Sequence, residues 1–143
     1  MTTADVKVAR IKNGFPYFAR VVLAIERAAT EPQILFSCSG RGGFISQGYI
    51  EEVPAIGYDD WKGGARAGIS FALAISHQTD CRVNVSTIEG LTTDTNPTIV
   101  GYAAALAVWR ALEFNPGAEI IEKMESTVFA SWRRPLEEIP AFP

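Results

Sequence analysis

Hydrophobic and polar residues follow two different periods along this chain, and the change between them is clearest from Cys81 to Phe114. The first part of this segment alternates, with Val83 and Val85 on one side, which is typical of a half-buried strand. From Ile99 onward the apolar residues follow the helical period over roughly five turns. The pattern predicts a strand, a polar loop and an almost wholly apolar helix, which a sheet or another helix must cover.

The residues just before this helix are suited to begin it. Thr95 or Asn96 can accept a hydrogen bond from a free amide, and Pro97 fits the first helical position because no N–H is needed there. Residues 92–96 would also offer oxygen ligands to a cation, but capping explains the same residues without one. We therefore expect no metal site in this loop.

Strand-like segments are predicted in the first third of the chain. Asp5–Ile11 alternates weakly and is expected to be an edge strand. Tyr17–Ala28 also fits a helix, but we assign it to a strand because Pro16 enters it and a turn at 30–32 leaves it. Gln33–Ser39 is a short β-rich run that glycines interrupt, and Phe44–Tyr49 would resume the pairing.

A long helix is predicted to begin at Asp59, which we interpret as its N-cap. Gly63, Gly64 and Gly68 would each weaken a free helix by about 1 kcal/mol relative to alanine. We therefore interpret them as positions where the helix lies tightly against a neighbour. The apolar face of this helix consists of Trp61, Ala65, Ile69, Ala72 and Leu73.

A third, amphipathic helix is predicted over Ala118–Ser131, with acidic residues opposite an apolar stripe. Because a sandwich could be complete at Phe114, the stripe needs cover from the same domain or from a second subunit. We expect a homo-oligomer or another protein partner, since two-fold dimers are the commonest assemblies. The candidate interface residues are Ile120, Ile121, Met124, Val128, Phe129 and Trp132.

Length and composition restrict the class of protein. The 143 residues suit a single domain, residues 1–143, with a core over 5–114 and a C-terminal helix and tail over 115–143. The net charge of −3 argues against nucleic acid as the main partner. No apolar run reaches the roughly 20 residues of a membrane span, and no secretory signal opens the sequence. We expect no membrane contact, a cytoplasmic location, and buried free thiols at Cys38 and Cys81.

One glycine-rich loop is the main candidate for binding chemistry. Its amides could form a nest around a small anion, and Arg41 could add a bidentate contact. A hairpin or bulge would use the same glycines, and no helix follows to complete a phosphate fingerprint. His77 lacks ligand or triad partners at a suggestive spacing, so we assign no catalytic residue, metal or cofactor. The candidate anion-binding residues are Ser39, Gly40, Arg41, Gly42 and Gly43.

From Tyr17 to Phe114 the order of elements resembles the fourth domain of elongation factor G, in the superfamily named for the second domain of a small-subunit ribosomal protein. The resemblance rests on the VVLAIE-like strand, on residues 48–55, on the glycine-containing helix and on the strand Arg82–Ile88. A loop holding Asp94, Thr95 and Asn96 follows, where the family tends to carry an Asp-Ser pair. The resemblance implies an α+β fold: a two-layer α/β sandwich with a mainly antiparallel sheet of about four strands, two helices on one face and a left-handed βαβ crossover. The C-terminal helix predicted from the apolar stripe is added to this sandwich.

In elongation factor G this domain reaches the ribosomal decoding region through loops at its tip. Here Gly90-Leu91-Thr92 stands where the family usually shows a histidine-bearing tip, and the sequence holds no GTPase phosphate loop. We therefore expect a stand-alone, non-enzymatic domain that binds another protein or its own copy. Two alternatives stay open: a small enzyme or metabolite-binding protein that holds an anion at Arg41, and an RNA- or ribosome-associated protein.

Overall fold

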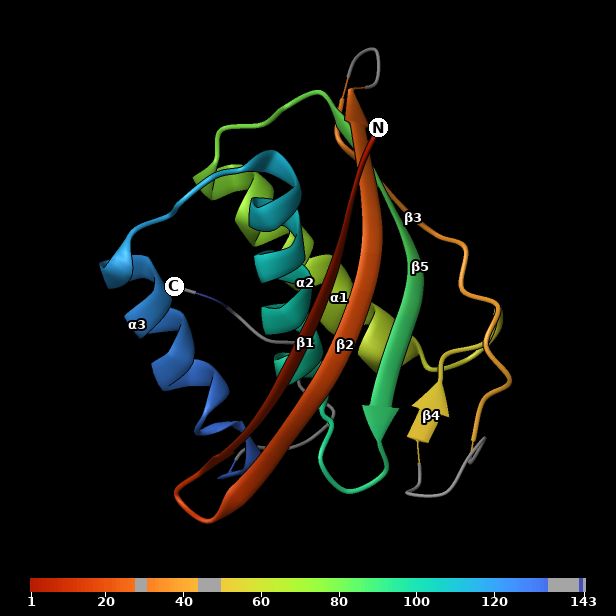
Figure 1. Ribbon diagram of the computed structural model, residues 1–143, viewed down its shortest axis with the longest axis vertical. Helices are drawn as coiled ribbons and strands as arrows, with labels where there is room; N and C mark the ends of the chain where they lie inside the picture. The colour runs from red at the N-terminus through yellow and green to blue at the C-terminus, as the bar shows by residue number, and fades with distance from the viewer. Residues whose placement is uncertain (28–30, 44–49, 134–141, 143) are drawn as a thin grey trace.

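The computed structural model describes residues 1–27, 31–43, 50–133 and 142, and these residues form an α+β fold (Figure 1). The strands are β1 (Thr2–Lys12), β2 (Phe15–Arg27), β3 (Gln33–Phe36), β4 (Ile50–Glu52) and β5 (Cys81–Leu91). The helices are α1 (Asp59–Ile75), α2 (Pro97–Leu112) and α3 (Ala118–Val128), followed by a single 3-10 turn, η1 (Ser131–Arg133). The expected α+β sandwich with an added C-terminal helix is confirmed.

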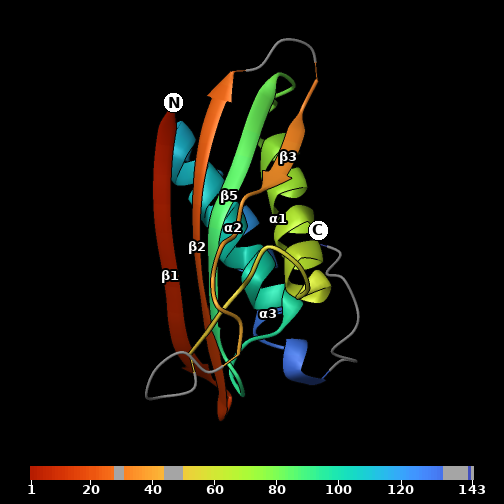
Figure 2. The ribbon, with the colours of Figure 1, turned by 90° about the vertical axis from the view of Figure 1, so that its right-hand side faces the viewer.

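The strands form one mixed sheet in the order β1-β2-β5-β3. β1, β2 and β5 are antiparallel neighbours, whereas β3 runs parallel to the first part of β5 and β4 pairs antiparallel with its end. Figure 2 shows the sheet as one layer, with α1 and α2 as the second layer against one of its faces. The expected edge strand near the N-terminus is therefore confirmed, and it begins at Thr2.

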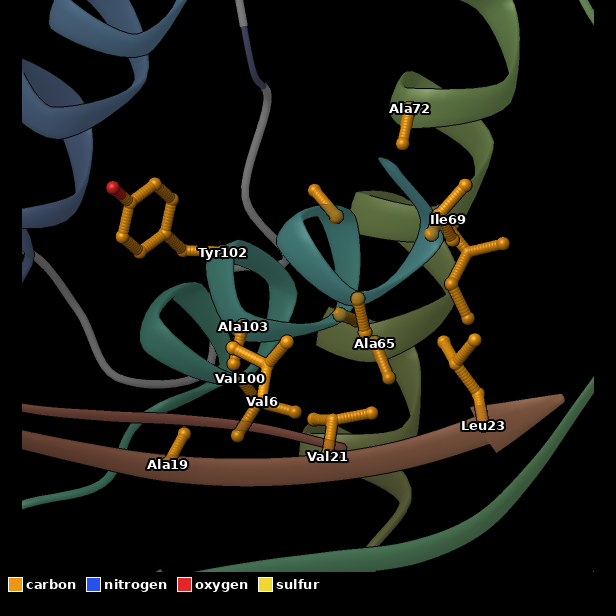
Figure 3. Close-up of a cluster of buried hydrophobic side chains, with 14 of the residues drawn as sticks. Val6, Ala19, Val21, Leu23, Ala65, Ile69, Ala72, Val100, Tyr102 and Ala103 are labelled. Carbon is orange, nitrogen blue, oxygen red and sulfur yellow. The ribbon is translucent and has the colours of Figure 1, made fainter. Parts of the chain in front are cut away.

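The core lies between the sheet and the two long helices, because alternate side chains of each strand point toward them. In β2, the side chains of Ala19, Val21 and Leu23 are fully buried and point toward the helices (Figure 3). The residues between them are only partly buried, because successive side chains of a strand point to opposite faces of the sheet. α2 packs on β1 and β2, on α1 and on α3. Nearly all of its residues are buried for this reason, as the apolar run predicted.

The two long helices touch through glycines. A side chain at Gly64 would overlap the Pro97 carbonyl of α2, and one at Gly68 would overlap the Gly101 carbonyl. The interpretation of these two glycines as positions of close approach is confirmed. Near the other end of the contact, the Trp109 indole donates a hydrogen bond of 3.1 Å to the Ala72 carbonyl oxygen.

The helix starts were predicted with mixed success. Asn96 caps α2 by accepting a 2.9 Å hydrogen bond from the Ile99 amide, and Pro97 is the first helical residue, as expected. The prediction that Asp59 caps α1 was wrong. Tyr58 holds that position in a left-handed conformation with no side-chain cap, and Asp59 is the first residue inside the helix.

Two further predictions about segments need comment. α3 ends at Val128, earlier than the expected Ser131, because the chain there tightens into η1. The expected pairing of Phe44–Tyr49 lies outside the described residues. Leu106, on α2, is only partly buried and packs against the core.

Candidate functional site

The glycine-rich loop at 39–43 lies against a segment that comprises β4 and the residues leading from it into α1. Three of its amides already donate to oxygens of that segment, so they are not turned toward a common anion site. These hydrogen bonds run from Gly40 to the Val53 carbonyl at 3.0 Å, from Gly42 to the Glu52 carbonyl at 2.8 Å and from Gly43 to the Tyr58 hydroxyl at 2.8 Å. The predicted nest is therefore not formed, and the glycines serve a close approach of main chain to main chain.

The electrostatic surroundings of this loop also disfavour an anion. Arg41 is exposed, and the same segment carries two carboxylates, Glu51 and Glu52. The Glu51 carboxylate accepts a 2.6 Å hydrogen bond from Tyr58, whose pKa is raised first by burial and then by this contact. An anion held at Arg41 would be repelled by the neighbouring carboxylates. These contacts fit a hairpin or bulge at residues 39–43 better than an anion-binding loop.

The apolar stripe of α3 is covered by its own domain. Met124 and Val128 are fully buried, and the Phe129 ring lies 5.0 Å from that of Tyr17 in an edge-to-face arrangement. These three interface candidates thus offer no free surface to a second subunit, and their assignment is corrected to a contact within the chain. Ile120, Ile121 and Trp132 are partly buried against the same core.

Polar contacts hold α3 and η1 in this position. The Glu125 carboxylate accepts 2.8 Å hydrogen bonds from Arg10 of β1 and from the Tyr102 hydroxyl of α2. Burial by itself would raise the pKa of Glu125, but these two hydrogen bonds and the positive charges of Arg10 and Lys12 together outweigh burial, and the pKa is lowered. The Trp132 indole donates to the Pro16 carbonyl at 2.6 Å, which ties η1 to the start of β2.

A different surface stands out at the end of the sheet where the β1–β2 turn and the β5–α2 loop meet. We call this the distal end, and it lies at the bottom of Figure 1. Asn13 and Gly14 form the turn with positive φ angles of 53° and 81°, as a tight hairpin requires. The Phe18 amide donates to the Asp94 carbonyl at 2.9 Å, and the Thr95 hydroxyl donates to the Phe18 carbonyl at 2.6 Å. The loop is thereby fixed to β2.

The distal end carries a shallow, mostly apolar hollow of about 480 Å³, which we call the distal hollow. The Ile11 side chain at its rim is 76% exposed, and the Phe18 and Leu91 side chains, which also line the hollow, are partly exposed. Large exposed apolar side chains that gather in one place mark interaction sites more often than isolated ones do. The hollow is lined by Ala9, Arg10, Ile11, Pro16, Tyr17, Phe18, Leu91 and Asp94.

Two charged residues, Arg10 and Asp94, line the distal hollow, and only one of them forms an ion pair among the described residues. Arg10 is paired with Glu125. Asp94 accepts a 2.8 Å hydrogen bond from the Thr93 hydroxyl, and no cation lies within ion-pair distance of its carboxylate among the described residues. The hollow therefore offers one uncompensated negative charge beside an apolar surface.

Sequence reasoning missed this surface. The weak alternation of β1 placed Ile11 on the same face of the strand as Lys7 and Ala9. Periodicity alone does not show which of the two faces of the sheet the helices will cover. An isoleucine on the mostly polar side of an edge strand, beside an Asn-Gly turn, was the available signal. Its neighbours Phe18 and Leu91 come from other strands, so only the assembled sheet brings them together.

Other reactive side chains do not gather into a site. Within residues 1–27, 31–43 and 50–133, no group of three or more His, Cys, Asp and Glu is placed to hold a metal ion. His77 is exposed just beyond α1, with a positive φ of 57°. Cys38 and Cys81 are buried free thiols, as expected. In the same part of the chain, no helix has the length and apolar character to cross a membrane.

Comparison with known proteins bears on the fold. No protein-family model and no curated protein sequence matches this chain. Solved structures do, among them a crystal structure of a protein from Thermus thermophilus with a TM-score of 0.58 and 17% sequence identity. The match covers 79% of this chain but 16% of that one, so this chain spans a small part of its length. At this identity the likeness shows the fold alone.

Proposed function

We propose that this chain is a non-enzymatic binding domain that holds a segment of another protein in the distal hollow. The observation that carries the proposal is the exposed Ile11 beside Phe18 and Leu91, at the end of the sheet where two connections converge. The occupant that fits is a short apolar segment carrying one cationic side chain, because the hollow is mostly apolar and Asp94 supplies one negative charge.

The resemblance to the fourth domain of elongation factor G also supports the distal end as the binding surface. In that family the tip loops make the functional contacts, and here the corresponding loop contains Leu91 and Asp94. The tip lacks a histidine, and Gly90 lies directly under the Trp61 ring, which leaves no room there for a side chain. The proposal therefore keeps binding at the tip and leaves out translocation and GTP hydrolysis. It also keeps the cytoplasmic location expected from the sequence.

The two alternatives receive less support. An anion-binding enzyme would need the amides of Gly40, Gly42 and Gly43, which donate to oxygens of the protein itself. An RNA-associated protein would need a basic face, but Arg10 is neutralised by Glu125 and Asp94 lies in the hollow.

Site-specific photocrosslinking tests the proposal. A benzoylphenylalanine placed at Ile11 in host cells should form one defined protein adduct, and the same group at Ile56 should not. Ile56 is a matched control because it is 89% exposed, apolar and outside the lining of the distal hollow. The adduct is identified by mass spectrometry, and its protein is then purified for a binding measurement.

The binding measurement decides the outcome. With the purified partner, Ile11→Asp should raise the Kd at least about tenfold, since it places a charge in an apolar contact. Asp94→Asn should raise it by a smaller factor, and Ile56→Asp should leave it unchanged. Equal affinity for the Ile11 and Ile56 variants would refute the proposal, and an RNA adduct at Ile11 would favour the RNA-associated alternative.

A further inference from the structure

β1 is an eleven-residue strand, and one of its edges pairs with no other strand among the described residues. It pairs with β2 along its whole length, and it ends the described sheet (Figure 2). A free edge of this kind presents a row of N–H and C=O groups that can pair with another strand. This edge shares Ala9 with the lining of the distal hollow, but its capacity to pair rests on main-chain groups of β1 and not on the exposed Ile11 side chain that carries the binding proposed for the hollow.

The main-chain groups that face the free edge belong to the odd-numbered residues of β1. In an antiparallel ladder, alternate residues turn their N–H and C=O toward one neighbour and the residues between turn away. The Val22 carbonyl accepts from the Ser86 hydroxyl of β5, so Val22 faces β5 and its partner in β1, Asp5, faces outward. In agreement, the Arg110 side chain reaches the Asp5 carbonyl oxygen at 2.9 Å.

The side chains along this edge make it complementary to itself. Asp5 and Lys7 lie two residues apart, so both point to the face of the sheet that the helices leave open. Asp5 forms an ion pair with Arg20 at 2.8 Å, whereas Lys7 has no carboxylate within ion-pair distance in the part of the chain that is described. A second copy running antiparallel can bring its own Asp5 to Lys7.

We propose that two copies of this chain associate by antiparallel pairing of their β1 strands about a two-fold axis at Val6. In this register the Asp5 of each copy faces the Lys7 of the other, and the outward groups from Thr3 to Ala9 form on the order of eight hydrogen bonds. The two neighbouring registers with matched outward groups place Asp5 opposite Asp5 or Lys7 opposite Lys7, and like charges directly opposite are unfavourable.

Arg110 competes with this pairing. Its guanidinium occupies the Asp5 carbonyl, which in the dimer accepts a hydrogen bond from the Lys7 amide of the other copy. Arg110 is exposed and can move away without opening the core. The dimer is therefore reversible and forms as concentration rises, and Arg110→Ala strengthens it.

Sedimentation velocity over a concentration series, combined with amide hydrogen exchange, tests the pairing on the full chain. The expected result is a monomer–dimer equilibrium in which the amides of Thr3, Asp5, Lys7 and Ala9 gain protection as the dimer forms. The Val6 amide bonds to β2 and should be protected at every concentration. A monomer at all concentrations, or a dimer that leaves the four odd-numbered amides unprotected, would overturn the proposal.

Charge variants test the register. Lys7→Glu and Asp5→Lys should each weaken dimerisation by roughly tenfold, since each puts two pairs of like charges opposite one another. An equimolar mixture of the two should recover the wild-type affinity, because every new side chain then faces an opposite charge. Lys123→Glu makes the same charge change on α3 and should have no effect.

Folding of the variants is checked by thermal unfolding. Asp5→Lys removes one partner of Arg20, which keeps Glu89 at 3.1 Å. If Lys7 only protected the edge from pairing, the wild type would stay monomeric and Lys7→Glu would change nothing. A mixture that associates no more tightly than either variant alone would likewise refute the register at Val6.

Discussion

At Gly68 the main chain of α1 approaches that of α2 so closely that no side chain fits between them. In a free helix, replacing glycine by alanine would stabilise by about 1 kcal/mol. Here the added methyl group would push the helices apart, so we expect Gly68→Ala to lower the free energy of unfolding by about 3 kcal/mol. Chemical denaturation measures this difference.

The control for this substitution lies two residues further along the same helix. Ser70 is exposed, so Ser70→Ala should change the free energy of unfolding by no more than about 0.5 kcal/mol. If Gly68→Ala raised the stability as in a free helix, the close contact with Gly101 would be contradicted.

The two cysteines should be slow to react in the folded protein. Burial raises the pKa of the Cys38 thiol, and burial together with the nearby Asp80 carboxylate raises that of Cys81. Because the thiolate is the reactive form, we expect a thiol-specific reagent at neutral pH to modify both residues only when denaturant is present. Rapid modification of either cysteine in the native protein would show that its side chain is accessible.

At the scale of an element, the docking of α3 depends on the charge of Glu125. Its pKa is lower in the folded protein than the ordinary 4.5, so its contribution to stability is present above that pH and is lost as the pH falls below it. We expect Glu125→Gln to cost about 1 kcal/mol at neutral pH, since the pair is partly exposed. The difference from wild type should shrink as the pH falls, which denaturation at several pH values measures.

A second carboxylate on α3 provides the comparison. Glu119 forms an ion pair with Lys123 one turn along the helix, and its side chain is 83% exposed. Water and salt screen such a pair, so Glu119→Gln should leave the stability nearly unchanged at every pH. An equal effect of the two substitutions would mean that Glu125 has no special part in holding the helix.

At the scale of the whole molecule, α3 belongs to the core of the domain. Met124, Val128 and Phe129 are buried in the core, where the Phe129 ring packs against Tyr17 and Tyr102, and each buried side chain of this kind contributes about 1.5–3 kcal/mol. A chain that ends at Pro116 should therefore lose most of its stability and bind a hydrophobic dye. Calorimetry and dye fluorescence test this, and a cooperative, dye-free unfolding transition in the shortened chain would contradict it.

The sequence by itself determined most of the elements. The strand at β2, which was assigned from its flanking turns, and the alternation in β5 were placed correctly. Of the two proposed caps, Thr95 and Asn96, it is Asn96 that caps α2, and the close approach is confirmed at Gly64 and Gly68. The start of α1 and the end of α3 were placed wrongly. The first turn of α1 is fixed by the left-handed backbone of Tyr58, and no local preference of a tyrosine indicates that conformation.

Only the tertiary structure decided what those elements do. Arg10 and Glu125 meet across 115 residues of sequence, and this contact places the stripe of α3 on its own domain. The loop at Gly40 is likewise closed by Val53, and the distal hollow joins Ile11 to Leu91. Hydrophobic periodicity specifies which face of a segment is apolar. It cannot specify the partner of that face, because the partner comes from a distant part of the chain and is selected by the packing of the whole fold.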